Sequence, residues 1–203
     1  MNNAPPPSNS NTGRYSPTLI VLAIIPLLGF AAAITLLLSS NTSPSATTGT
    51  PRTANVGSLN QPMPEFSVVS LDGDPVDLSQ YRGRPVFVNF WGTWCPPCVR
   101  ELPELQAFAA AQGDTGAVVV ASNNTETSDR IRQYFDDNGL ILDDIVFVQD
   151  YDSTMYRWFG VFQMPTTFLV DAEGVVRSFK YGPFDVAGMQ SYLDDLAASQ
   201  SGG

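Results

Sequence analysis

The segment Val88-Asn89-Phe90-Trp91-Gly92-Thr93-Trp94-Cys95-Pro96-Pro97-Cys98 is the most informative part of this 203-residue chain. It contains the only two cysteines of the sequence, and these follow an apolar, strand-like run that begins at Pro85. A strand that leads into Cys-x-x-Cys at the start of a helix places the first sulfur at the positive end of the helix dipole, where a thiolate is stabilised. The second sulfur then lies about one helical turn deeper. The pattern predicts a redox-active pair that cycles between a dithiol and a disulfide.

Residue types that the chain lacks exclude several kinds of site. The sequence has no histidine, so Ser-His-Asp and Cys-His catalytic groups, and metal or haem sites that depend on histidine, lack their central residue. Two cysteines cannot build a four-cysteine zinc or iron–sulfur site within one chain. A structural disulfide is the alternative, but such a short loop removes little entropy from the unfolded chain. We therefore expect a redox-active Cys95–Cys98 disulfide, with no metal and no other cofactor.

Residues 18–38 form an uncharged, apolar run that as a helix would reach roughly 31 Å, enough to span a bilayer. The run is longer than the apolar region of a cleaved signal peptide, and only a weak small-residue site follows it, which favours a retained anchor over a removed signal. Arg14 precedes the run, and the next positive residue is Arg52. This asymmetry predicts a single-pass protein of the cell membrane whose remaining residues lie on the extracytoplasmic side.

Composition divides the rest of the chain into three parts. Residues 1–17 are rich in Asn, Pro and Ser and predict a disordered tail. Residues 39–62 are rich in Ser, Thr, Pro and Gly and predict a flexible linker. Residues 63–199 predict one globular domain. The chain has ten basic and twenty acidic residues, and its net charge of −10 argues against nucleic acid as a partner.

Hydrophobic periodicity predicts the order of helices and strands in residues 63–199. Apolar runs on either side of Asp72-Gly73 predict an N-terminal β-hairpin. Further strands are expected at 85–90, 117–121, 145–148, 166–170 and 175–180. Helices are expected after Cys95, after Thr127 or Ser128, after a cap at Asp152, and over 186–196. This order predicts an α/β fold, with a mixed β-sheet and helices on both faces.

These patterns resemble the thioredoxin superfamily, and within it the membrane-anchored, extracytoplasmic thiol-disulfide oxidoreductases of the TlpA/ResA/CcmG type. The segments that carry the resemblance are Val88 to Cys98, Arg100 to Pro103, and Met164 to Asp171 with Gly174 after it. Their order and spacing cover nearly the whole domain. The region from about 127 to 149 resembles the central insertion of this branch. The resemblance implies a thioredoxin-like sheet with an N-terminal hairpin and this insertion.

The resemblance also implies roles for the two cysteines and one carboxylate. Cys95 is expected to be the exposed nucleophile that attacks a client disulfide, and Cys98 the resolving thiol. Plain thioredoxins carry a buried aspartate at the position that Asn89 occupies in this chain. The amide of Asn89 cannot take a proton, so another group must do so. Glu101 lies three residues after Cys98 on the same helical face and matches the active-site glutamate of the ResA-type branch. Glu101 is thus the expected proton acceptor, and an ordinary solvated helix glutamate is the alternative.

Four further residues are expected to bind substrate. Pro165 resembles the cis-proline that faces the dithiol in this superfamily, although spacing alone does not fix the isomer. A cis bond would turn the Met164 backbone towards the sulfurs, where its N–H and C=O can pair with an extended client segment. Thr166 is expected to line the same groove. Trp94, beside Cys95, is expected to form an exposed docking surface, whereas Trp91 is expected in the core.

The resemblance implies a protein disulfide reductase. It would receive electrons from a membrane thiol donor of the CcdA/DsbD type and pass them to client protein disulfides. Apocytochrome c is the first candidate client and a copper-site assembly protein the second, and the residues do not choose between them. Pro96 and Pro97 offer no N–H donor and no charge near the first sulfur. The pair is therefore expected to be more reducing than a Cys-x-x-Cys that contains histidine.

Two alternative functions remain open. A thiol peroxidase shares the fold, but its pattern needs Thr or Ser three residues before the cysteine and Pro seven residues before it. Gly92 and Val88 occupy these positions. A Cu(I)-binding module could use both thiolates, but related copper chaperones add a histidine and space their cysteines further apart.

Overall fold

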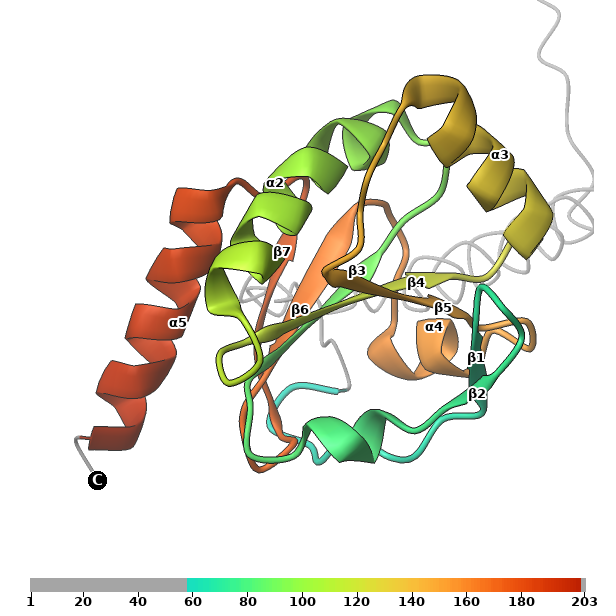
Figure 1. Ribbon diagram of the computed structural model, residues 1–203. Coiled ribbons are helices and arrows are strands. Elements are labelled where there is room, and N and C mark those ends of the chain that lie inside the picture. The colour runs from blue at the N-terminus through green and yellow to red at the C-terminus, as the bar shows by residue number, and fades with distance from the viewer. Residues whose placement is uncertain (1–57, 202–203) are drawn as a thin grey trace, which may run out of the picture. The chain divides into compact units, whose positions relative to one another are not determined.

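The computed structural model describes residues 58–201, which form a mixed sheet of seven strands flanked by helices (Figure 1). The strands are β1 (Val68–Ser70), β2 (Pro75–Val76), β3 (Val86–Phe90), β4 (Val118–Asn123), β5 (Ile145–Gln149), β6 (Thr166–Val170) and β7 (Val176–Tyr181). The helices are α2 (Pro96–Gln112), α3 (Ser128–Asn138), α4 (Thr154–Phe159) and α5 (Val186–Ser201), together with a short 3-10 helix, η1 (Leu78–Tyr81). The predicted order of strands and α-helices is confirmed.

The strand order across the sheet is β2-β1-β5-β4-β3-β6-β7. β3, β4 and β5 run parallel, whereas β6 runs antiparallel to β3 with Phe90 opposite Thr166. The N-terminal hairpin of β1 and β2 is confirmed and pairs with the outer side of β5. The carboxyl ends of three parallel strands and the start of β6 therefore meet at one edge of the sheet. The Cys-x-x-Cys follows β3 at this edge.

Alternating side chains of the central strands form a core on each face of the sheet. Phe87 belongs to a buried cluster with residues of α2, α3 and α5, whereas Val86 and Val88 belong to a second cluster with residues of α4 and η1. Because successive side chains of a strand point to opposite faces, the fully buried β3 serves both cores. Figure 1 shows α2 and α5 beside one another and α4 across the sheet from them. Helices on both faces are thus confirmed.

Two predicted boundaries need correction. The N-cap of α4 is Ser153 and not the predicted Asp152. Asp152 accepts a hydrogen bond from the Thr154 amide, whereas the amides of Met155 and Tyr156 donate to the buried Asp150, which no sequence pattern marks. The second correction concerns residues 58–62, which were assigned to the linker. Backbone hydrogen bonds join Asn60 and Gln61 to Val176, so these residues are part of the domain. A short segment without apolar periodicity gives no signal of such pairing.

The predicted tail, the anchor at 18–38 and most of the linker lie outside the described residues. Within residues 58–201, no helix combines the length and the apolar character needed to cross a membrane.

Candidate active site

The two cysteines lie where β3 passes into α2. Cys95 is the N-cap of α2, and Pro96 and Pro97 fill the first two positions of the helix. Proline suits these positions because their N–H groups would have no partner within the helix. The sulfurs of Cys95 and Cys98 form a disulfide, and the Cα atoms lie 5.3 Å apart. The structure therefore represents the oxidised form of the expected dithiol.

The two sulfur-bearing residues differ in their exposure to solvent. Cys95 is 5% exposed, whereas Cys98 is fully buried in the cluster beneath α2. Cys95 is thus less exposed than predicted. It is nevertheless the one of the two cysteines that solvent reaches, which supports Cys95 as the sulfur that attacks a client disulfide. A buried thiol at Cys98 would lose its proton reluctantly, because burial disfavours the charged thiolate. A proton acceptor close to Cys98 would offset that cost.

Glu101 is a buried carboxyl on the face of α2 that carries Cys98. The side chain is 2% exposed, and its oxygens accept hydrogen bonds from Asn89 Nδ2 at 2.9 Å and from the Phe184 amide at 2.8 Å. Burial raises the pKa of Glu101 from its usual 4.5 to about 7, although these two donors and the positive charge of Lys180 lower it. The alternative of a solvated helix glutamate is excluded by this burial. A carboxyl that titrates near neutral pH is suited to exchange a proton with a thiol.

Asn89 supports Glu101 and does not titrate itself. Its amide nitrogen donates to Glu101 and also to Thr167 Oγ1 at 2.9 Å. All three side chains are buried and come from three elements, β3, α2 and β6. Asn89 Oδ1 has no hydrogen-bond partner among the described residues. Thr167 was not predicted as part of the site, because its contact with Asn89 joins residues 78 positions apart.

The loop before β6 lies opposite the end of β3, and Met164 packs against the core cluster that contains both cysteines. The peptide bond between Met164 and Pro165 is cis, as the resemblance implied. Met164 is half-buried, and Pro165 is buried. Thr166 is fully buried, and its hydroxyl donates to the Gln163 carbonyl at 2.8 Å. The expected contact of the Thr166 side chain with substrate stays a prediction, and this burial does not favour it.

The two tryptophans occupy contrasting positions. Trp91 is fully buried against Phe135 and Phe147, which confirms its predicted place in the core. Trp94 is 58% exposed next to Cys95, and its indole nitrogen donates to Thr125 Oγ1 at 3.1 Å. A β-carbon on Gly92 would lie 2.6 Å from this indole nitrogen, so only glycine permits the observed approach. Trp94 thus presents a fixed aromatic surface beside the reactive sulfur.

A carboxylate that sequence reasoning missed supports the loop before Cys95. Glu126 accepts hydrogen bonds from the Thr93 amide at 2.7 Å, from the Thr93 hydroxyl, and from Asn123 Nδ2 at 2.8 Å. Asn123 in turn accepts from the amides of Thr125 and Glu126, both at 3.0 Å. The end of β4 therefore supports the segment between β3 and α2. No local motif marks Glu126, because its partner Thr93 lies 33 residues away.

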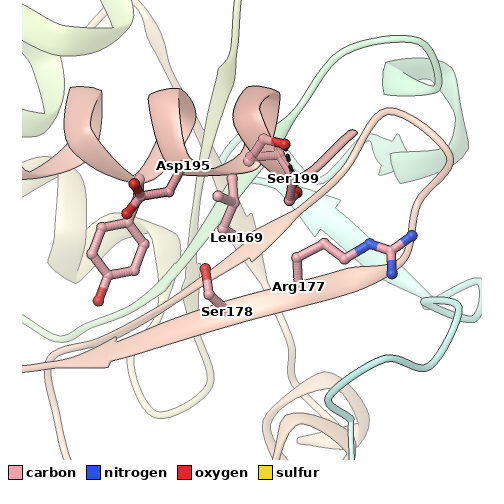
Figure 2. Close-up of a pocket in the computed structure, with 7 residues that line it drawn as sticks. Leu169, Arg177, Ser178, Asp195 and Ser199 are labelled. Carbon is pink, nitrogen blue, oxygen red and sulfur yellow. Dashed lines mark hydrogen bonds between the residues drawn. The ribbon is translucent and has the colours of Figure 1, made fainter. Parts of the chain in front are cut away.

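A separate hollow of about 370 Å³ lies between β6, β7 and α5 (Figure 2). Its lining residues are Leu169, Arg177, Ser178, Tyr192, Asp195, Leu196 and Ser199. Leu169 pairs with Phe87 near the start of β3, whereas the dithiol follows the end of that strand. Arg177 is already paired with Asp171, at 2.5 Å. This hollow is therefore not part of the dithiol site.

Among residues 58–201, no group of His, Cys, Asp and Glu side chains is arranged to hold a metal ion.

Comparison with known proteins places this fold and site in a family. Residues 59–179 match the AhpC/TSA family. The thiol-disulfide oxidoreductase ResA of Geobacillus thermodenitrificans is 32% identical over 133 residues, which cover 66% of this chain and 75% of that protein. ResA of Bacillus thuringiensis subsp. konkukian is 30% identical over 138 residues, 68% of this chain and 78% of that protein.

Solved structures agree with the sequence comparison. A putative thiol:disulfide interchange protein DsbE from Chlorobium tepidum superimposes with a TM-score of 0.59 at 26% identity, covering 69% of this chain and 96% of that one. These relatives share the fold, and the Cys-x-x-Cys of this chain lies at the helix start that such chemistry requires. The chain therefore belongs to the AhpC/TSA family and, within the thioredoxin superfamily, to the ResA-like protein thiol-disulfide oxidoreductases.

Proposed function

We propose that this oxidoreductase acts as a reductase of client protein disulfides on the extracytoplasmic side of the cell membrane. The observation that carries the proposal is the buried Glu101 carboxyl, which lies one helical turn from the buried Cys98. This arrangement supplies a proton acceptor to the resolving thiol, which is the thiol that needs one.

The reaction begins with the reduced dithiol. The Cys95 thiolate attacks one sulfur of the client disulfide, forms a mixed disulfide and releases the second client sulfur as a thiolate, which takes up a proton. Cys98 then transfers its proton to Glu101 and attacks the Cys95 sulfur. The bond between Cys95 and the client breaks, and the client leaves with two reduced thiols. The protein is left with the Cys95–Cys98 disulfide seen in the structure.

Client binding is proposed at the surface around Cys95. Trp94 offers exposed aromatic area, and the Met164 backbone before the cis-proline offers an N–H and a C=O to an extended segment. A client that is unfolded around its disulfide can supply such a segment. Apocytochrome c, with its haem-attachment cysteines, is the proposed client, and a copper-site assembly protein is the second candidate.

Regeneration requires two electrons and two protons from another dithiol. A membrane thiol donor of the CcdA/DsbD type is the proposed source, and no further cofactor is needed. Anchoring through residues 18–38 would keep the domain close to such a donor. Fractionation of cells that express the full chain tests this part: we expect the protein in the membrane pellet after carbonate extraction and its domain accessible to protease from outside. A protein in the carbonate supernatant would contradict the anchor.

Trapping of client proteins in native membranes tests the proposed reaction. In Cys98→Ser the mixed disulfide cannot be resolved, so mass spectrometry of the trapped complexes should identify the client, with apocytochrome c among the products. The matched control is Cys95→Ser, which should trap little. More partners on Cys95→Ser than on Cys98→Ser would reverse the roles of the two sulfurs. Rapid peroxide consumption with an added thiol donor, or tight one-to-one binding of Cu(I), would instead favour one of the alternative functions.

A further inference from the structure

One peptide group, between Pro183 and Phe184, lies between two charged side chains. Its N–H donates to Glu101 Oε2 at 2.8 Å, and its carbonyl accepts a hydrogen bond from Lys180 Nζ. Lys180 Nζ also donates to the Gly182 carbonyl at 3.3 Å. The cis peptide bond in residues 58–201 is the one before Pro165, so the group before Phe184 is trans. In a trans peptide the N–H and C=O point in opposite directions. The ammonium and the carboxylate therefore meet opposite ends of one peptide dipole.

The ring of Phe184 holds this peptide group in place. Phe184 is buried and packs edge-to-face on Phe87 and Tyr192, with ring centroids 6.1 Å and 5.1 Å away. Lys180 Nζ lies 4.8 Å from the centroid of the same ring, close enough for a cation–π interaction. Lys180 thus contacts both the carbonyl side of the peptide and the side chain that follows it. Packing of the Phe184 ring thus holds the peptide group that lies between Lys180 and Glu101.

Two physical effects act in the same direction along this connection. A donor on the Pro183 carbonyl polarises the peptide group and makes the Phe184 N–H a stronger donor to Glu101. The positive charge of Lys180 also favours a negative charge nearby, and the half-buried position of Lys180 limits screening by solvent. Both effects stabilise the ionised form of Glu101, which is the form that can accept a proton.

The other groups around Glu101 are neutral or bonded elsewhere. Asn89 on β3 is a neutral donor, and Cys98 on α2 is part of the disulfide. The nearest carboxylates along the chain, Glu104 and Asp185, are exposed and accept hydrogen bonds from amides at the start of α5. Lys180 on β7 is the charged side chain that influences the titration of Glu101.

We propose that Lys180 is a positioning residue which, through the peptide group between Pro183 and Phe184, keeps Glu101 able to accept the proton of Cys98 near neutral pH. The inference rests on the proposed role of Glu101 in the resolving step. Without the charge of Lys180, Glu101 remains protonated to higher pH, and the attack of Cys98 on Cys95 shifts in the alkaline direction.

Lys180→Gln in the full-length chain tests the proposal, because glutamine retains a donor for the carbonyls but loses the charge. The matched control is Arg130→Gln, which removes one positive charge from the exposed start of α3. Carbon-13 NMR of the carboxyl groups should show the titration midpoint of Glu101 raised by about half a pH unit or more in Lys180→Gln. The midpoint should be unchanged in Arg130→Gln and close to the original value in Lys180→Arg.

The rate of the resolving step provides the second measurement. Cys95 of the reduced protein attacks Ellman's reagent, releases one thionitrobenzoate and retains the other half as a mixed disulfide. The attack of Cys98 on Cys95 then releases the second thionitrobenzoate, and the rate of this second release is measured. The pH profile of this release should shift with the Glu101 midpoint in Lys180→Gln. In a Glu101→Gln background, the Lys180 substitution should cause no further shift.

The two measurements separate the possible failures. An unchanged Glu101 midpoint in folded Lys180→Gln overturns the role of Lys180 and leaves the proposed function intact, because Glu101→Gln would still alter the profile of the parent chain. A profile that is insensitive to Glu101→Gln overturns the proton-acceptor role itself, and the Lys180 proposal with it.

Discussion

At the level of single residues, the buried carboxyl of this site is on the helix and not on the strand. Asn89 on β3 donates both to the Glu101 carboxyl and to the Thr167 hydroxyl. A carboxylate at position 89 would bring a second acceptor and a like charge towards Glu101, which costs free energy in a buried site. The amide is therefore the side chain that fits a glutamate at position 101.

Replacement of Glu101 should slow the resolving step. In Glu101→Gln, the release of thionitrobenzoate by Cys98 at neutral pH should be at least about tenfold slower, because general-base assistance by a positioned group typically contributes 10²-fold or more. The rate should also lose the part of its pH dependence that has a midpoint near 7. Glu104→Gln, one turn further along α2 and exposed, is the control and should behave like the parent. Equal rates in the two variants would remove Glu101 from the mechanism.

The two prolines between the cysteines should set the redox potential. Pro96 and Pro97 occupy the first two helix positions without N–H groups that could stabilise a Cys95 thiolate. Pro97→His adds an N–H and a side chain that can carry positive charge, both of which favour the thiolate and hence the reduced form. Equilibration with glutathione should give a potential that is more oxidising by about 30 mV or more, roughly tenfold in the exchange constant. A more reducing variant would contradict this account of the prolines.

At the scale of elements, the active-site segment depends on its neighbours in the sheet. The loop between β3 and α2 bonds to Glu126 after β4, and the cis-proline loop lies across from the end of β3 because of the antiparallel pairing with β6. The first turn of α4, on the other face, donates two backbone hydrogen bonds to the buried Asp150 that follows β5. Each of these loops lies at the carboxyl edge of the parallel strands. The segment that carries the dithiol is thus held by loops of the neighbouring strands as well as by α2.

Loss of Glu126 should loosen the segment that carries Trp94 and Cys95. Glu126→Ala leaves the Thr93 amide and hydroxyl without their acceptor, so the free energy of unfolding should fall by about 2 kcal/mol. Hydrogen exchange at the Thr93 amide should become faster. Glu65→Ala, at an exposed position in the segment before β1, is the control and should change the stability by less than about 0.5 kcal/mol. Unchanged exchange at Thr93 in Glu126→Ala would show that the loop is held by other contacts.

At the scale of the whole molecule, the buried Glu101 links the stability of the domain to pH. The folded-state pKa of about 7 is above the unfolded value of 4.5, so between these values the folded protein binds more protons than the unfolded chain. Stability should therefore fall as the pH rises from about 4.5 to about 7 and then level off. The contribution of this one group is about 3 kcal/mol. The ionised carboxylate is tolerated because two hydrogen bonds and Lys180 offset part of its desolvation.

Denaturant unfolding of the oxidised protein at a series of pH values measures this linkage. The difference in unfolding free energy between Glu101→Gln and the parent should shift in favour of the variant as the pH rises from 4.5 to 8. The comparison with the variant is needed because burial also raises the pKa of Asp150, which titrates in both proteins. A constant difference over this pH range would show that Glu101 titrates at its ordinary pKa.

Much of this architecture could be predicted because its signals are local. The apolar run of β3, the Cys-x-x-Cys, the hairpin turn at Asp72-Gly73 and the glycine at position 139 that ends α3 each act through residues close in the chain. The resemblance added Glu101 and the cis-proline loop, since both lie within short recognisable segments. The sequence pattern predicts a domain that starts at residue 63, which is too late, because Asn60 and Gln61 are held by hydrogen bonds to distant Val176 and not by a pattern of their own.

The order of strands and helices, the two faces of the sheet and the position of the dithiol at a helix start follow from the amino-acid sequence alone, because periodicity, turns and caps are properties of neighbouring residues. Which side chains gather around the active-site segment depends on how distant parts of the chain fold together. Thr167, Glu126 and Lys180 reach the site from separate strands and loops, over intervals in the chain at which no short-range pattern exists. The pKa of Glu101 also depends on the tertiary structure, because it is set by burial together with hydrogen-bond donors from β3 and from the segment before α5.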